Sequence, residues 1–249
     1  MLKVDLRRMF TMPLLYIMTG ISVVTPILVL VMTTMMDGTT TVNPQTGMVT
    51  TMEGFQNAWQ GIGSFSGAVM SMDLTSMCNI NLVYFMLAVL VCVFVAADFR
   101  SGYAKNLFTV RAKKSGYVMS KTIVGIVGGL IMLAAYFAGT MIGGAIAGLS
   151  FDLGETSVMG IVMCMLAKAA LIAVFAPIYV LMSVIAKQKL WMSLEGSLFG
   201  SMLLFMMIPM MTPLDSTIMH VVLCVAGAAM FTAGLGAVSK TVLNKTDLV

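Results

Sequence analysis

Six long apolar runs constrain this chain more than any other feature. A transmembrane helix needs about 20 consecutive apolar residues, and continuous runs favour helices over the alternating strands of a barrel. The predicted spans are 13–36, 79–97, 122–149, 157–186, 190–208 and 218–238. Hydrophobic residues make up 59% of the chain, above the roughly 45–50% of soluble domains. We therefore expect an all-α integral membrane protein with one domain over residues 1–249.

The basic residues lie on one side of these spans. All but one of the 14 Lys and Arg residues fall before the first span, in loop 98–121, between the fourth and fifth spans, or after the sixth. The opposite loops, including the long loop 37–78, carry acidic residues but no Lys or Arg. By the positive-inside rule, both termini and loop 98–121 are cytoplasmic. We expect a multi-pass protein of the cell membrane.

Two flanking segments have their own patterns. In residues 1–12, Leu2, Leu6 and Met9 recur on one side of a helix and basic residues elsewhere, which predicts an amphipathic elbow helix on the inner leaflet. In the outer loop, 39–51 is rich in Thr, Gly and Pro and is expected to be flexible. Residues 55–72 favour either a short amphipathic helix or a loop packed on the span ends.

Loop 98–121 is the most basic part of the chain. Its positive residues are Arg100, Lys105, Arg111, Lys113, Lys114 and Lys121. Phe99, Tyr103 and Leu107 recur every four residues, followed by Val110, which predicts one apolar stripe on a short helix. Such a helix suits docking against a partner or the anionic inner leaflet. The alternative is that the loop is basic only because topology requires it.

The loop also carries a motif. It has Asp98, Gly102 four residues later and Leu107, then Arg111, Tyr117 and Lys121 leading into the third span. This resembles the first cytoplasmic loop of type-2 ABC exporter permeases. The six spans and long first outer loop are most similar to the small permeases of bacterial bacitracin- and lantibiotic-resistance transporters.

The resemblance implies the membrane subunit of an ATP-driven exporter that moves an amphipathic substrate, such as an antimicrobial peptide or a drug, outward. The implied contact with the ATPase consists of Asp98, Arg100, Gly102, Tyr103, Lys105, Asn106, Leu107 and Arg111. The implied partners are cytoplasmic ATPase subunits, a second copy of this permease or a related one, and membrane lipid. No nucleic-acid partner is expected.

The sequence carries no motif for ATP hydrolysis. It contains no G-x-x-x-x-G-K-[ST] motif to cradle phosphates, so ATP and magnesium are expected on the separate ATPase. His220 is the sole histidine, which excludes an H-E-x-x-H zinc site. We expect a transporter subunit and not an enzyme. The alternative is a secondary transporter or channel without an ATPase. Such a protein is expected to carry several intramembrane acids for ion coupling.

Lys168 and Glu195 are ionisable residues within predicted spans. A charge at the bilayer centre costs about 2.5–3.5 kcal/mol, so each needs a partner or water. Their depths differ by roughly 20 Å at 1.5 Å per residue, so we do not expect them to pair. Lys168 is a candidate for the transport path or for a structural pairing. Glu195 is also a candidate for the path, although its position near the interface favours a structural role.

The glycine, cysteine and methionine residues are interpreted as packing residues. Gly139 and Gly143 in the third span are spaced for close helix packing. The four cysteines lie in or beside apolar runs and are interpreted as small hydrophobes. The 28 methionines are interpreted as adaptable apolar packing, and no metal site is expected.

Overall fold

The computed structural model describes residues 1–42, 49–51, 54–63, 79–109, 113–153 and 156–245. Its helices are α1 (Leu2–Thr11), α2 (Pro13–Met35), α4 (Leu82–Arg100), α5 (Tyr103–Thr109), α6 (Lys114–Ala147), α7 (Val158–Ala186), α8 (Leu190–Met211) and α9 (Ile218–Lys245). A 3-10 turn, η1 (Ala58–Gly61), and two short strands, β1 (Thr40–Val42) and β2 (Val49–Thr51), complete the elements. Six helices, α2, α4, α6, α7, α8 and α9, are long and apolar enough to cross a membrane, as predicted.

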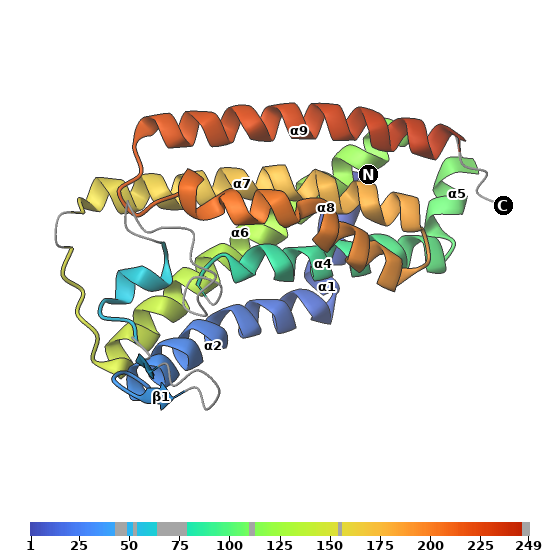
Figure 1. Cartoon of the computed structure of the whole chain (residues 1–249). Coiled ribbons are helices and arrows are strands. Elements are labelled where there is room, and N and C mark those ends of the chain that lie inside the picture. The colour runs from blue at the N-terminus through green and yellow to red at the C-terminus, as the bar shows by residue number, and fades with distance from the viewer. Residues whose placement is uncertain (43–48, 52–53, 64–78, 110–112, 154–155, 246–249) are drawn as a thin grey trace.

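The long helices run side by side and give the molecule two ends (Figure 1). One end, here the terminal end, holds α1, α5, the start of α6 and the last turns of α9. There the Lys114 ammonium donates to the Leu243 carbonyl at 2.7 Å. The other, here the hairpin end, holds β1, β2 and η1. The strands pair antiparallel, with Thr40 opposite Thr51, so segment 39–51, which we expected to be flexible, contains a paired hairpin in its described part.

A proline sets the corner between α1 and α2. Pro13 occupies the first turn of α2, and the residue before a proline is pushed out of the helical region. Met12 is accordingly extended, with φ −82° and ψ 123°. The chain turns there, and α1 packs against α6. Asp5 and Met9 of α1 are buried and Leu6 packs against the core, whereas Leu2 is exposed; the predicted apolar side therefore packs against the bundle through Leu6 and Met9.

The segment after α4 is more helical than predicted. Gly102 has φ +73°, a conformation that glycine adopts without strain, and it separates α4 from α5. Phe99 therefore belongs to one helix and Tyr103 and Leu107 to the next, so the predicted single stripe is wrong; Val110 lies outside the described residues. The 34-residue α6 is about 50 Å long against a hydrocarbon core of about 30 Å. Residues 114–121, expected in the loop, are its first turns.

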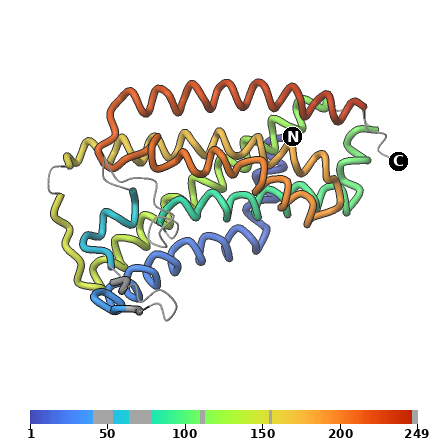
Figure 2. Tube along the Cα trace, viewed as in Figure 1, coloured from blue at the N-terminus to red at the C-terminus, as the bar shows by residue number. Residues whose placement is uncertain are grey.

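Glycines in α6 allow close packing against α2. A Cβ on Gly139 would clash with the Val23 carbonyl oxygen, and one on Gly143 would lie 2.8 Å from the Ile27 Cα. Neither position accepts a side chain without a backbone shift, which confirms the predicted close packing. Figure 2 shows α2 beside α6 and α9 along α7.

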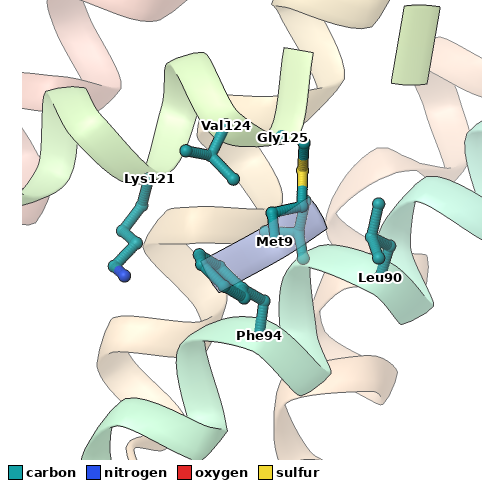
Figure 3. Close-up of a pocket in the computed structure, with 7 residues that line it drawn as sticks. Met9, Leu90, Phe94, Lys121, Val124 and Gly125 are labelled. Carbon is teal, nitrogen blue, oxygen red and sulfur yellow. The ribbon is translucent and has the colours of Figure 1, made fainter. Parts of the chain in front are cut away.

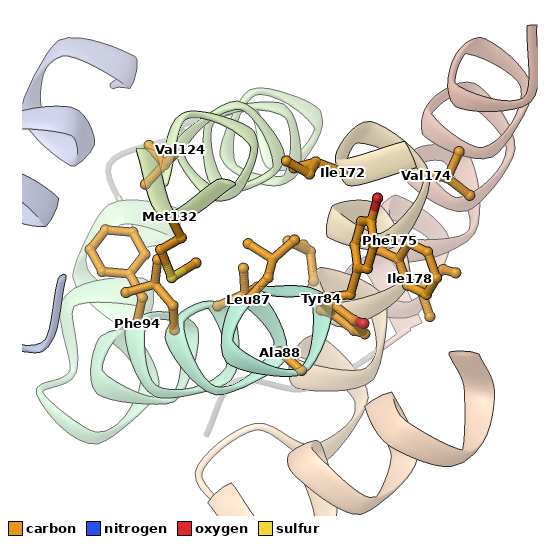
Figure 4. Close-up of a cluster of buried hydrophobic side chains, with 14 of the residues drawn as sticks. Tyr84, Leu87, Ala88, Phe94, Val124, Met132, Ile172, Val174, Phe175 and Ile178 are labelled. Carbon is orange, nitrogen blue, oxygen red and sulfur yellow. The ribbon is translucent and has the colours of Figure 1, made fainter. Parts of the chain in front are cut away.

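The core lies between α4, α6 and α7 (Figure 4). Tyr84 and Phe175 have ring centroids 4.7 Å apart. Cys92, Cys164 and Cys224 are free and buried, in agreement with their interpretation as small hydrophobes; Cys78 lies outside the described residues. The outward faces of α8 and α9 are mostly exposed and apolar, as expected for helices that contact lipid.

Candidate functional site

Four charged residues form an ion-pair cluster at the terminal end: Asp5, Arg8, Asp98 and Lys121. They come from α1, α4 and α6, and all but Arg8 are fully buried. The Lys121 Nζ lies 2.8 Å from the Asp5 Oδ1 and 2.6 Å from the Asp98 Oδ2. An Arg8 Nη lies 2.8 Å from the Asp98 Oδ1. Two carboxylates thus face two cations, and the cluster ties three helices together.

Neutral donors add hydrogen bonds to these carboxylates. The Ser120 hydroxyl donates to the Asp5 Oδ2 at 2.6 Å, and the Tyr117 hydroxyl donates to the Asp98 Oδ2 at 3.1 Å. Tyr117, Ser120 and Lys121 are three and four residues apart on α6, so they share one helix face. Buried charges are tolerated where pairing and hydrogen bonds are both present, and this cluster has both.

Aromatic rings enclose the two cations. The Lys121 ammonium lies 4.3 Å from the Phe94 ring centroid, and the Arg8 guanidinium lies 4.4 Å from that of Tyr103, within the range of cation–π attraction. Met9, Phe94 and Lys121 line a cavity of about 10 Å³ between α1, α4 and α6 (Figure 3). A cavity of this size holds one water at most, so the cluster is closely packed.

The environment shifts two groups of α1 and α5. Burial lowers the pKa of Arg8, but the carboxylates of Asp98 and Asp5 raise it by more, so the net pKa lies above its ordinary value. The pKa of Tyr103 is also raised, first by burial and then by the negative charge of Asp5. Arg8 therefore stays charged and Tyr103 stays neutral at physiological pH.

The structure separates the predicted ATPase-contact residues into two groups. Asp98 is fully buried, so its carboxylate faces Arg8 and Lys121 and is not available to a partner. Tyr103 is half-buried against Arg8, and Leu107 is half-buried against the core. Gly102 is half-buried at the turn between α4 and α5.

The other predicted contact residues point outward where they are described. Lys105 and Asn106 are exposed on α5. Arg100 is exposed at the end of α4, and its Nε donates to the Gln188 carbonyl at 3.3 Å. Arg111 lies outside the described residues. The face of α5 with Lys105 and Asn106 is thus free of packing within the described chain.

Lys168 forms a second, different polar site. It is fully buried on α7, and its Nζ donates to the Asn81 Oδ1 at 3.0 Å and to the Thr212 Oγ1 at 2.9 Å. The Tyr84 hydroxyl donates to the Lys168 carbonyl at 3.0 Å. Among the described residues, no carboxylate lies within ion-pair distance of Lys168. The ammonium is therefore held by neutral acceptors.

Glu195 lies apart from Lys168 and is not buried. It is exposed on α8, and the ion pairs of the described chain do not include it. The two intramembrane charges therefore do not pair with one another, as their depths predicted.

Sequence reasoning missed most of each polar site. Arg8 and Lys121 were assigned only to membrane-surface charge or to the loop motif, and Asp5, Asn81 and Thr212 were not singled out. Asp5 and Asp98 are acids among the basic segments of one side, and that charge complementarity is the signal that was available. Asn81 and Thr212 gave none, because they are neutral residues at helix ends.

No group of three or more His, Cys, Asp or Glu residues capable of holding a metal occurs in the described part of the chain. No protein-family model matches the chain, and comparisons with curated proteins and with solved structures also give no match.

Proposed function

We propose that this chain is the membrane subunit of an ATP-driven exporter, with its terminal end in the cytoplasm and α5 as the contact for a separate ATPase subunit. In this proposal it works in the cell membrane beside a second copy or a related permease. Its substrate is amphipathic, in the class of antimicrobial peptides and drugs; this part rests on the resemblance of residues 98–121 to exporter loops.

The observation that carries the proposal is the attachment of α5. This short helix follows α4 directly and precedes α6, and the residues at its base belong to the ion-pair cluster or lie against it. Asp98 is four residues before Gly102, and Tyr103 stacks on Arg8. A force on α5 therefore acts on α1, α4 and α6 together, because the buried ion pairs join these helices.

The surface available for that force is small and polar. Lys105 and Asn106 are exposed on α5, whereas its apolar residues Leu107 and Phe108 pack inward. A partner that docks here meets a cationic side chain and an amide, which suits an acidic groove. The charges of the terminal end also suit the anionic inner leaflet, with Lys3 and Arg7 exposed on α1.

Co-purification tests the proposal. The tagged chain is isolated from native membranes as wild type and as Lys105→Glu/Asn106→Arg, followed by mass spectrometry and an ATPase assay. Both substituted side chains are exposed, so the fold is expected to survive. Lys240→Glu, also an exposed charge reversal at the terminal end, is the matched control.

We expect wild type and Lys240→Glu to retain an ATP-hydrolysing partner and the α5 variant to lose it. A chain that purifies without any ATPase would refute the exporter proposal and favour a secondary transporter or channel. Equal retention of the ATPase by all three chains would show that it docks on a surface other than α5.

A further inference from the structure

The helices around Lys168 end at different heights. Asn81 is the residue just before α4, and Thr212 is the residue just after α8. Both bond to the Lys168 Nζ, so α4 and α8 end at the level of this ammonium. By contrast, α7 continues for ten residues from Lys168 to Val158, about 15 Å further toward the hairpin end. The bundle thus has a recess above Lys168.

Segment 55–63, here the cap, occupies this recess. Ala58 and Ile62 are fully buried, and Ile62 packs with Ile161 and Leu214. The Ile80 amide donates to the Gly61 carbonyl at 3.0 Å. A Cβ on Gly63 would lie 3.3 Å from the Leu214 side chain and 3.5 Å from the Cys164 Sγ. Cys164 is one turn from Lys168 on α7, so the cap covers the layer directly above the ammonium.

Besides its packing on the bundle, the cap forms hydrogen bonds to a neighbouring loop. The Ala58 amide donates to the Ser150 carbonyl at 3.0 Å, and the Trp59 Nε1 donates to the Phe151 carbonyl at 3.0 Å. The Asn57 side chain donates to the Asp152 carbonyl. Opening of the cap breaks these bonds together with the apolar contacts of Ile62, so removal of some of the bonds is expected to favour the open state.

The layer beneath the cap is polar although it lies inside the bundle. Lys168, Asn81 and Thr212 meet there, and the described residues offer the ammonium no carboxylate. An ionisable residue within a membrane span is a candidate for a path that ions, water or polar solutes use. The cap is the element that separates this layer from the hairpin end.

We propose that the recess above Lys168 is a water-accessible vestibule of this protein and that cap segment 55–63 is its gate. When the cap leaves residues 150–153, water and polar groups of a solute reach Cys164 first and then Lys168. In the proposed exporter this vestibule is the exit of the transport path, and that role alone rests on the proposed function. The gate itself is tested without an ATPase.

Thiol labelling in intact cells tests the gate. Cys78, Cys92 and Cys224 are replaced by Ala, so that Cys164 is the sole thiol, and a membrane-impermeant maleimide is added from outside. Asn57→Ala/Trp59→Phe removes two side-chain bonds to residues 150–153 while it keeps an aromatic ring. We expect the labelling rate of Cys164 to rise about tenfold, as the loss of one or two hydrogen bonds predicts.

A cross-link tests the same gate in the opposite direction. Asn57 and Ser150 are bridge partners, which places them within reach of a disulfide. With Asn57→Cys/Ser150→Cys oxidised, mass spectrometry is expected to find less label on Cys164 than in the parent chain, and reduction is expected to restore it.

A second buried thiol is the control for unfolding. Cys92 is also fully buried, but it bonds to Ser197 far from the cap. With Cys92 as the sole thiol, labelling is expected to stay negligible in every cap variant. A labelling rate of Cys164 that is unchanged in both cap variants would overturn the proposal. Parallel rises in labelling at Cys92 and Cys164 would also overturn it, because general loosening of the fold would then explain the access.

Discussion

The two buried polar sites differ in how their charge is balanced. In the ion-pair cluster, Asp5 and Asp98 face Arg8 and Lys121 at 2.6–2.8 Å. At the other site, the Lys168 ammonium donates to the oxygens of Asn81 and Thr212, and no carboxylate of the described residues lies within ion-pair distance of it. A balanced cluster can be closely packed and permanent, because each charge compensates its neighbours. A single cation held by neutral groups favours access to water or an anion. The first site therefore suits transmission of force and the second suits contact with a solute.

The largest expected effect is on the balanced cluster. Asp98→Asn leaves Arg8 and Lys121 with one carboxylate between them, and breaking a buried ion pair costs about 3–5 kcal/mol. Thermal unfolding of the purified protein in detergent measures the loss, with Asp37→Asn, an exposed carboxylate, as the control. Asp98→Asn that stays within about 1 kcal/mol of wild type would show that the cluster behaves like a surface pair.

A matched pair of lysine substitutions sharpens the comparison. Lys121→Met leaves Asp5 and Asp98 buried with only Arg8, so we expect a loss of about 3–5 kcal/mol. Lys168→Met removes an isolated ammonium and leaves neutral groups, so we expect a loss below about 2 kcal/mol. Both changes keep an unbranched side chain of similar length. Equal losses in the same unfolding assay would abolish the distinction between the two sites.

Smaller effects are expected where α5 meets the cluster. Tyr103→Leu removes the ring beneath the Arg8 guanidinium, and a cation–π contact is worth about 0.5–1 kcal/mol at a partly exposed site. Tyr103→Phe retains the ring and is expected to lose less. A larger loss for Tyr103→Phe than for Tyr103→Leu would mean that the hydroxyl, and not the ring, holds α5.

The smallest effect is expected at an exposed carboxylate of the hairpin end. Asp37 accepts a bond from the Gly54 amide at 2.9 Å and one from Gln56 at 3.3 Å, and these bonds lower its pKa, the Gly54 bond most. Because the folded-state pKa lies below the unfolded value of about 3.9, the stabilisation is complete above that pH. It is lost as the pH falls through the folded-state pKa.

The comparison of wild type with Asp37→Asn isolates this contribution. Melting temperatures of both proteins between neutral pH and acid are expected to converge as the pH falls. Melting temperatures that diverge as the pH falls would show that folding raises the pKa of Asp37 and does not lower it.

The spans could be predicted from the sequence because hydropathy depends on composition over many residues. The start of α2 at Pro13 and the start of α8 at Leu190 agree with the prediction. The helix ends near the terminal end could not be located in this way. Residues 114–121 carry basic side chains but continue α6, since the buried cluster compensates Lys121.

The polar sites were less predictable because their partners are distant in the sequence. Asp5 and Lys121 are 116 residues apart, and Asn81 and Lys168 are 87 apart. Positive-inside charge accounts for Arg8 and Lys121 at the membrane surface without any contact, so topology hid their pairing. Lys168 was singled out because its charge was unusual for its depth, but the neutral residues around it carried no comparable signal.

ATP-dependent labelling of Cys164 tests the central claim most directly. The chain with Cys164 as its sole thiol is purified with the ATPase subunit that we propose, placed in lipid nanodiscs and labelled with the impermeant maleimide, with and without ATP. We predict that ATP changes the labelling rate, because force on α5 passes through the ion-pair cluster to the helices around the vestibule, and that Lys105→Glu/Asn106→Arg abolishes the response. A Cys164 rate that is identical with and without ATP, while the bound ATPase hydrolyses ATP, would contradict the account.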